Sequence, residues 1–270
     1  MHDELEAAIA AARAGGDVLV TRRDDHGASR SKSSPTDFVT EADISSGVAI
    51  ARCLADRDAD ARFVIEEEEV YDLAGVARGK LTDPEVWVVD PLDGTTSFIH
   101  GYPCYSVSVA LLKNGRPVAG AVFNAASGEM NAGALGLGAT RDGKRLRVSP
   151  AQRVSDALLI TGFPYDRGEL LNTQLAVLAA FLRAPVHGIR RDGSAAVDCC
   201  HVAAGRADGF WEYGLKPWDM AAGVLILEEA GARVTDTDGA TWTDESSSIC
   251  AANPALHAAM LDVIRGVDAG

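Results

Sequence analysis

The sequence lacks long apolar runs: its best stretch, Val107–Leu112, ends at Lys113, far short of the roughly 20 residues that span a bilayer. The N-terminus, MHDELEAAIAAARAGG, has acids where a secretory signal would have bases. Basic residues are in deficit, because 25 Lys and Arg face 39 Asp and Glu, for a formal net charge of −14. We therefore expect a soluble, cytoplasmic protein that binds neither nucleic-acid polymers nor anionic membranes.

Cysteine is scarce and scattered, with no CxxC spacing. This odd-numbered set argues against both a structural zinc site and a disulfide framework. The two adjacent cysteines lie in a small-residue stretch with helical character, which favours a packing role. The set comprises Cys53, Cys104, Cys199, Cys200 and Cys250.

What the chain does have is enough apolar material, 47% of 270 residues, to bury a large core. There are no internal repeats and no low-complexity linker. We therefore expect a single domain over residues 1–270. A subdivision into 1–150 and 151–270 fits the change of pattern near Ser149–Ser155.

In the first half, helical periodicity gives way to short strands with a hairpin signal at Lys113–Arg116. We expect a polar loop over Asp24–Pro35 and helices over Glu4–Val20, ending near Gly15–Gly16 or shortly after, and Ile44–Ala55. The expected strands are Arg62–Ile65, Val86–Val89, Tyr105–Leu112, Pro117–Asn124 and Glu129–Ala132.

In the second half, strands and helices alternate, which predicts an α/β layer arrangement. The expected helices are Leu170–Arg183, Ala195–Ala204, Met220–Ala230 and His257–Arg265. The expected strands are Ala157–Thr161, Val186–Arg190, Ala207–Trp211, Arg233–Thr235 and Ser248–Ala251.

The most informative segment is WVVDPLDGTT, in which an apolar strand runs into Asp90. Pro91 should stop the strand from continuing as a paired one. Asp93, Gly94 and Thr95 then suggest a turn into a helix, where free N–H groups can bind an anion. Two carboxylates at such a bend can face one point, although an Asp that only caps a helix is also common.

Further acids stand at comparable positions. The run Glu66–Glu69 follows an apolar strand, and Asp219 opens a small-residue helix in WDMAAG. A solvated acidic string and another helix cap are the simpler interpretations of these two features.

Together these blocks resemble the inositol monophosphatase family of magnesium-dependent, lithium-sensitive phosphatases. The resemblance spans nearly the whole chain and implies an αβαβα sandwich. It also draws on the segments KSSP, DFVTEAD, FIHGYP, GSAA and FWE, which begin at Lys32, Asp37, Phe98, Gly193 and Phe210.

The resemblance implies the metal ligands Asp90, Asp93, Asp219, the Leu92 carbonyl and one Glu. Matching VIEEE to the family's apolar-apolar-Gly-Glu-Glu pattern selects Glu67, with Glu66 in place of the usual Gly, and leaves the assignment open by one residue. Oxygen ligands without a His/Cys cluster suit Mg²⁺, or Mn²⁺, and not zinc. About two or three ions per site would be expected.

The resemblance also implies catalytic and substrate-binding roles. Glu67 and Thr95 would activate a metal-bound water, and Asp43 would accept the Thr95 hydroxyl proton. Lys32 would stand in a basic loop near the metals, while Lys216 and His100 are weaker candidates. The implied substrate contacts are Gly94, Thr95, Gly193, Ser194, Ala195 and Glu212.

We expect a phosphoric monoester hydrolase acting on myo-inositol 1-phosphate, because Glu212 matches a position that binds an inositol hydroxyl. Histidinol phosphate, fructose 1,6-bisphosphate and 3′-phosphoadenosine 5′-phosphate are the alternatives within the superfamily. A non-catalytic or moonlighting regulatory binding protein is the alternative of another class. A homodimer is implied by the resemblance alone.

Overall fold

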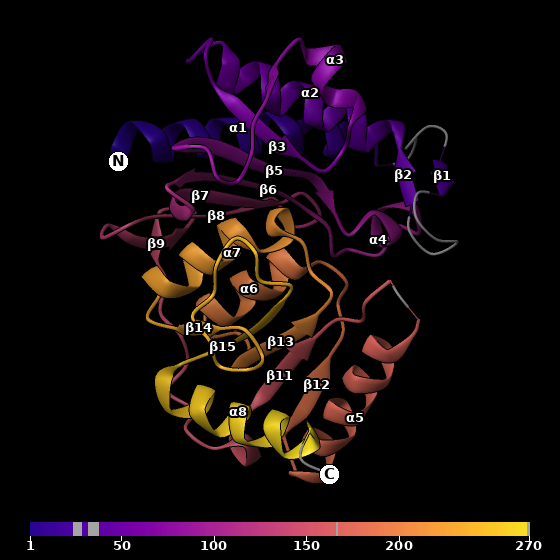
Figure 1. The fold of residues 1–270 in the computed structure, drawn as a ribbon, viewed down its shortest axis with the longest axis vertical. Coiled ribbons are helices and arrows are strands. Elements are labelled where there is room, and N and C mark those ends of the chain that lie inside the picture. Colours follow the sequence, from indigo (N-terminus) through magenta and orange to yellow (C-terminus); the bar gives the residue numbers. More distant parts are fainter. Residues whose placement is uncertain (24–28, 32–37, 166, 269–270) are drawn as a thin grey trace.

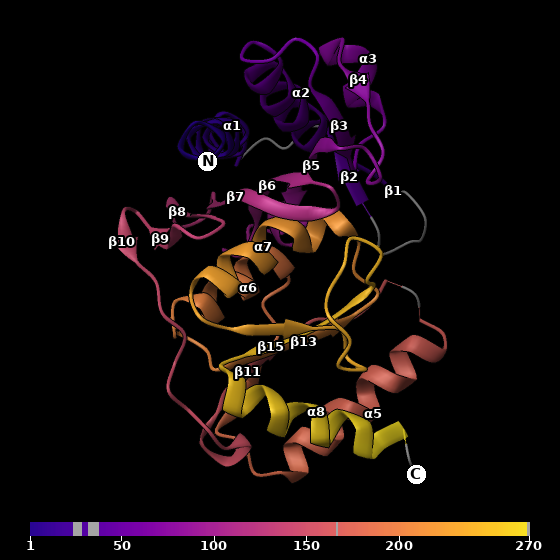
Figure 2. The ribbon, with the colours of Figure 1, turned by 60° about the vertical axis from the view of Figure 1, so that its left-hand side comes forward.

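The computed structural model describes residues 1–23, 29–31, 38–165 and 167–268. An eight-stranded and a five-stranded sheet alternate with helical layers, which gives the predicted αβαβα sandwich (Figure 1). Figure 2 shows the same order of layers from a second direction. No helix in the described part of the chain is both long and apolar enough to cross a bilayer.

The helices are α1 (His2–Thr21), α2 (Glu41–Ala55), α3 (Glu69–Ala74), α4 (Thr95–Ile99), α5 (Glu169–Arg183), α6 (Ala195–Ala203), α7 (Pro217–Glu229) and α8 (Pro254–Asp268), with one 3₁₀ turn at Val154–Asp156. A short two-stranded ribbon pairs β1 (Ser29–Ser31) with β2 (Phe38–Thr40).

The larger sheet has the order β10-β9-β8-β7-β6-β5-β3-β4. Its strands are β3 (Arg62–Ile65), β4 (Ala77–Arg78), β5 (Glu85–Asp93), β6 (Ser106–Lys113), β7 (Arg116–Asn124), β8 (Glu129–Ala134), β9 (Gly138–Arg141) and β10 (Lys144–Arg145). β3 runs parallel to β4 and β5, and the other neighbours are antiparallel.

The smaller sheet has the order β12-β11-β13-β15-β14. Its strands are β11 (Leu158–Thr161), β12 (Gly188–Arg190), β13 (Gly209–Tyr213), β14 (Arg233–Thr235) and β15 (Ser248–Ala252). β11 runs parallel to β12 and β13. β15 pairs antiparallel with β13 on one side and with the edge strand β14 on the other.

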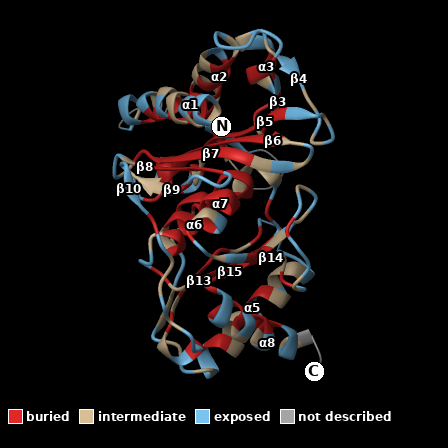
Figure 3. Cartoon of the chain, turned by 90° about the vertical axis from the view of Figure 1, so that its left-hand side faces the viewer, coloured by how far each residue is buried: buried red, intermediate tan, exposed pale blue. Residues whose placement is uncertain are grey.

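Both faces of the larger sheet are buried, which explains its nearly continuous apolar strands. Along β5, Trp87 and Val89 face the core under α1 and α2, whereas Val86 and Val88 face the core around α6 and α7. The red, buried segments of Figure 3 accordingly concentrate in the sheet and in α6 and α7. A third core lies between the smaller sheet and helices α5 and α8.

The first helix, expected over Glu4–Val20, does extend to Thr21 and passes through Gly15–Gly16. A Cβ at Gly16 would lie only 1.9 Å from the Phe123 ring, so the missing side chain lets α1 pack on β7. Two local expectations were wrong. Strand β5 continues through Pro91 to Asp93, with an irregular register that accommodates the proline. Ser29–Ser31, expected in a loop, pairs as β1.

Candidate active site

A cleft opens where β3 and β5 end and where α6 and α7 begin. Figure 1 shows the turn before α4 at the level where the larger sheet meets the α6–α7 layer. The cleft combines carboxylates, a glycine-rich turn, aromatic rings and one guanidinium. The described residues that line it are Phe38, Glu66, Asp90, Leu92, Asp93, Gly94, Thr95, Gly162, Phe163, Tyr165, Arg191, Gly193, Ala195, Glu212, Leu215 and Asp219.

The end of β5 holds Asp90 rigidly. The Leu92 N–H donates a hydrogen bond of 2.9 Å to Asp90 Oδ1, and Asp90 is only 2% exposed. On the far side of the strand, the Ser46 hydroxyl on α2 donates to the Pro91 carbonyl at 2.8 Å. The irregular strand end is therefore anchored to the helical layer behind it.

The turn after β5 requires glycine. Gly94 has φ of 94°, and an added Cβ would lie 2.9 Å from the Cys104 carbonyl oxygen and 3.0 Å from that of Gly193. A side chain there would be strained in conformation and would collide with the backbone. The turn and the Gly193 loop can therefore approach each other closely across the cleft.

Thr95 connects this turn to α2. Its hydroxyl lies 3.0 Å from Asp43 Oδ1 and 3.1 Å from the Leu92 carbonyl oxygen, and the group is 7% exposed. Asp43 Oδ2 accepts hydrogen bonds from the N–H and the hydroxyl of Thr40, which closes a capping box at the start of α2. Burial raises the pKa of Asp43 to about 6, against these hydrogen bonds.

Asp93, the last residue of β5, points its carboxylate at the N-terminus of α6. Its Oδ2 accepts hydrogen bonds from the Ser194 hydroxyl at 2.7 Å and from the Ala196 N–H at 2.8 Å. Burial raises the pKa of Asp93 to about 6, while these two donors oppose the rise. The Ser194 hydroxyl is thus bound to Asp93. Of the two predicted substrate contacts Ser194 and Ala195, only Ala195 lines the cleft.

Asp219 lies in the first turn of α7, where its Oδ2 accepts a hydrogen bond of 2.7 Å from the Lys216 N–H. Asp219 therefore does help to cap α7, and it also lines the cleft. Lys216 has an exposed side chain and is not among the residues that line the cleft.

The acidic run contributes its first residue to the cleft. Glu66 follows β3 directly, its N–H donates to the Val89 carbonyl beside Asp90, and the residue lines the cleft. Glu67 is buried, at 4% exposure, and does not line the cleft. Of the two residues between which the sequence left the choice open, Glu66 is therefore the one that lies at the cleft with Asp90.

The carboxylates of the cleft repel one another. Burial, followed by the charges of Glu66, Asp93 and Asp219, raises the pKa of Asp90 well above 3.8, and burial with Asp93 and Glu66 does the same for Asp219. Within the described residues, no three Asp, Glu, His or Cys side chains are already gathered as a complete cation site. The set nevertheless fits hard cations, because it gathers several carboxylate oxygens that raise one another's pKa in one cleft.

The opposite wall of the cleft belongs to the smaller sheet. Glu212 on β13 is buried, and burial together with Asp93 raises its pKa to about 8. It faces Gly162, where a Cβ would lie 2.0 Å from Glu212 Oε1. Gln174, fully buried on α5, donates to the Gly162 carbonyl at 2.7 Å and to the Thr161 hydroxyl, so the glycine is held in place.

Several predicted residues lie elsewhere. His100 is exposed and outside the cleft, and Lys32 falls outside the described residues. Burial raises the pKa of the Cys104 thiol strongly, which keeps it protonated and unsuited to nucleophilic attack. Phe163, Tyr165 and Arg191 also line the cleft and were not predicted from the sequence. Of the three, only Arg191, two residues before Gly193, lies beside a recognised motif.

The chain belongs to the inositol monophosphatase family, whose model matches residues 1–268. It is 40% identical over 235 residues to the phosphatase IMPL1, chloroplastic, of Arabidopsis thaliana, covering 85% of this chain and 61% of that one. It is 37% identical over 265 residues to the putative Nus factor SuhB of Neisseria meningitidis serogroup B, covering 98% of each. The solved inositol monophosphatase from Anabaena (Nostoc) sp. PCC 7120 superposes with a TM-score of 0.86 at 35% identity, covering 98% of this chain and 96% of that one.

Proposed function

We propose that this protein is a Mg²⁺-dependent phosphomonoesterase acting on myo-inositol 1-phosphate or a similar small polyol phosphate. The single observation that supports it is one cleft lined by Glu66, Asp90, Asp93 and Asp219 together with the Gly94–Thr95 turn and Glu212. Membership of a phosphatase family supports the reaction class.

The proposed ligands of the metal ions are Asp90, Asp93, Asp219, the Leu92 carbonyl and an acidic residue from the end of β3. For that residue we propose Glu66 in place of Glu67, because Glu66 lines the cleft beside Asp90. When bound, Mg²⁺ lowers the pKa of a water molecule and neutralises charge on the phosphate. Mn²⁺ offers the same oxygen-ligand chemistry.

The chain's own groups would orient the reactants. With its proton shared between Asp43 and the Leu92 carbonyl, the Thr95 hydroxyl oxygen keeps a lone pair to accept a hydrogen bond from the attacking water. The backbone N–H groups of Gly94 and Thr95 would donate to phosphate oxygens. Glu212, with Gly193 and Ala195 nearby, would accept a hydrogen bond from a substrate hydroxyl.

A substrate panel tests this proposal. Purified protein with Mg²⁺ is assayed for phosphate release from myo-inositol 1-phosphate, histidinol phosphate, fructose 1,6-bisphosphate and 3′-phosphoadenosine 5′-phosphate. We expect the highest kcat/KM for the inositol ester. A higher value for histidinol phosphate would contradict the substrate assignment, and no turnover of any ester would contradict the reaction class.

Relatives named Nus factor bear on the alternative of a regulatory binding role. The cleft favours catalysis, because a purely binding protein has no need of four carboxylates around one space. We also propose, from the family resemblance alone, a homodimer in the cytoplasm. Gel filtration with light scattering tests the dimer, for which a monomer at micromolar concentration would be the contrary result.

A further inference from the structure

Arg191 is the one basic side chain among the described residues that line the cleft. It lies between β12 and α6, in a chain whose net charge is −14 and in a cleft crowded with carboxylates. Over the described ranges, its guanidinium makes no hydrogen bond or ion pair, although its side chain is exposed to the cleft. A guanidinium without a protein partner keeps all its donors for a ligand.

The guanidinium lies close over the Gly193 loop. A Cβ added at Gly193 would be 2.8 Å from Arg191 Nη1 and 3.1 Å from the Ser97 hydroxyl. The next residue, Asp192, is directed elsewhere, since its Oδ1 lies 3.5 Å from the Tyr102 hydroxyl. The turn therefore presents a cation, without its acidic neighbour, to the cleft.

Arg191 lies close enough to the substrate wall to act on its charges. Its positive charge opposes the rise in pKa of Glu212, which lines the cleft from β13, and of Asp198 on α6. The cation therefore stands at the end of the cleft that Glu212 lines, where a substrate hydroxyl is proposed to bind.

We propose that Arg191 is a specificity-determining residue that binds a second anionic group of the substrate, such as a second phosphate. This inference rests on the proposed phosphatase function and extends its substrate class to small polyol phosphates that carry a second anionic group. The planar guanidinium matches the oxygens of phosphate or carboxylate in a two-pronged hydrogen bond. The aromatic rings of Phe163 and Tyr165, which line the same cleft, leave Arg191 as the group suited to an anion there.

The test compares substrates that differ only by the second phosphate. The pairs are myo-inositol 1-phosphate with myo-inositol 1,4-bisphosphate, and fructose 1-phosphate with fructose 1,6-bisphosphate. We expect Arg191→Ala to lower kcat/KM for at least one bisphosphate about ten-fold or more, mainly through KM, and for its monophosphate less than about three-fold. Arg191→Lys should fall between the two.

Arg190→Ala is the matched control, because Arg190 is the neighbouring exposed arginine, donates to the Ile189 carbonyl of its own strand and does not line the cleft. It should leave both substrate classes unchanged. Equal losses for both members of each pair in Arg191→Ala would overturn the inference, and so would a wild type that hydrolyses the monophosphates but neither bisphosphate. A wild type that hydrolyses none of the four would instead contradict the proposed function itself.

Discussion

Single-residue register decides which acid of Glu66–Glu69 reaches the cleft. The family pattern matched by sequence selects Glu67, whereas Glu66 is the residue beside Asp90 that lines the cleft. The sequence could not decide this, because four consecutive glutamates look alike and a shift of one residue reverses the direction of each side chain. The strand pairing of Ile65 with Val89 fixes the register in the fold.

The two candidates predict opposite rankings of two conservative variants. Glu66→Gln should lower kcat/KM about 100-fold or more, since it removes a charged oxygen ligand from the proposed metal site. Glu67→Gln should lower it less than about 10-fold. Steady-state kinetics at saturating Mg²⁺, with melting temperatures to show that both variants fold, provide the comparison. The reverse ranking would return the ligand role to Glu67.

Asp198 is a second residue with an unusual environment. It is 1% exposed on α6, and among the residues that the structure describes neither of its carboxylate oxygens has a hydrogen-bond partner. Burial raises its pKa well above 3.8, with further contributions from Glu212, Asp192 and Asp93 that Arg191 opposes. We infer that folding favours the protonated form of this carboxyl group.

When the pKa of a carboxyl group rises on folding, the protein becomes less stable as the pH increases. The reason is that the unfolded chain releases the proton at a lower pH than the folded chain does. Asp198→Asn removes the titrating group. The free energy of unfolding of the variant minus that of the wild type should therefore increase by about 1 kcal/mol or more between pH 5 and pH 8. Urea unfolding at both values with saturating Mg²⁺ measures it, with the exposed Asp262→Asn as control. Parallel curves for Asp198→Asn and wild type would show that Asp198 does not titrate differently on folding.

At the scale of elements, hydrophobic periodicity predicts most helices and strands to within a few residues. It does so because both faces of the larger sheet are buried, which gives apolar strands, and because α5 and α8 each bury one face against the smaller sheet. The errors arise where tertiary contact overrides local preference. Antiparallel pairing with β6, which joins Asp93 to Ser106, carries β5 past Pro91, where the proline predicted an end.

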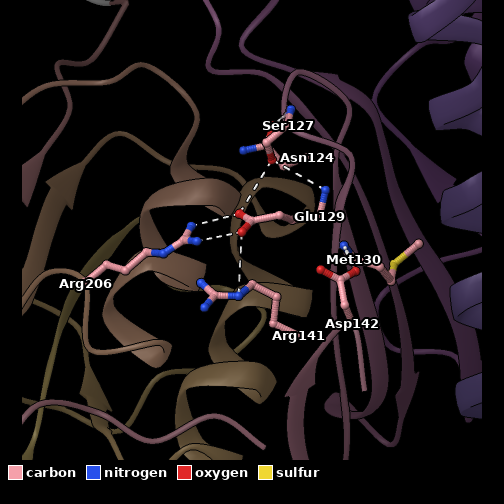
Figure 4. A network of polar contacts seen from close by, with 7 residues as sticks. All are labelled: Asn124, Ser127, Glu129, Met130, Arg141, Asp142 and Arg206. Carbon is pink, nitrogen blue, oxygen red and sulfur yellow. Dashed lines mark hydrogen bonds and ion pairs between the residues drawn. The ribbon is translucent and has the colours of Figure 1, made fainter. Parts of the chain in front are cut away.

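One ionic contact ties the two halves together. Glu129 on β8 accepts two hydrogen bonds from Arg206, which follows α6, at 2.6 and 2.8 Å, and also pairs with Arg141 on β9 (Figure 4). Hydrogen bonding by Arg206 lowers the pKa of Glu129. A carboxylate held in this two-pronged way contributes more than an ordinary surface pair.

We expect Glu129→Ala to lower the free energy of unfolding by about 1 kcal/mol, or a few degrees in Tm. Because the folded pKa is depressed, the loss should be full above the ordinary Glu pKa of 4.5 and should vanish only as the pH falls through the lowered pKa of the folded state. Glu85→Ala is the control, since Glu85 pairs with Lys113 within one sheet and is half exposed. Equal effects of the two variants at pH 7 would contradict a special role for Glu129.

At the scale of the whole molecule, the cleft needs both halves. The larger sheet supplies Asp90 and Glu66, α7 supplies Asp219, and the smaller sheet supplies Glu212. The sequence motifs predicted these residues because each one follows a recognisable strand or begins a helix. The chain gave no comparable signal for Phe163 and Tyr165, which reach the cleft only through packing of the β11–α5 segment.

The net charge of −14 fits this picture. Five of the 39 acidic residues line one cleft, where cations would reverse the local field and admit a small phosphate ester. Strict dependence on a divalent cation is therefore the central claim about the molecule, and it makes Asp90 the residue whose charge matters most.

The most direct test is phosphate release from myo-inositol 1-phosphate as Mg²⁺ is titrated into chelator-treated protein, for wild type and Asp90→Asn. We predict no turnover without Mg²⁺, saturable activation of the wild type, and a loss of about 1000-fold or more in the variant at every concentration. Turnover by the metal-free wild type, or substantial activity of Asp90→Asn at saturating Mg²⁺, would contradict the account.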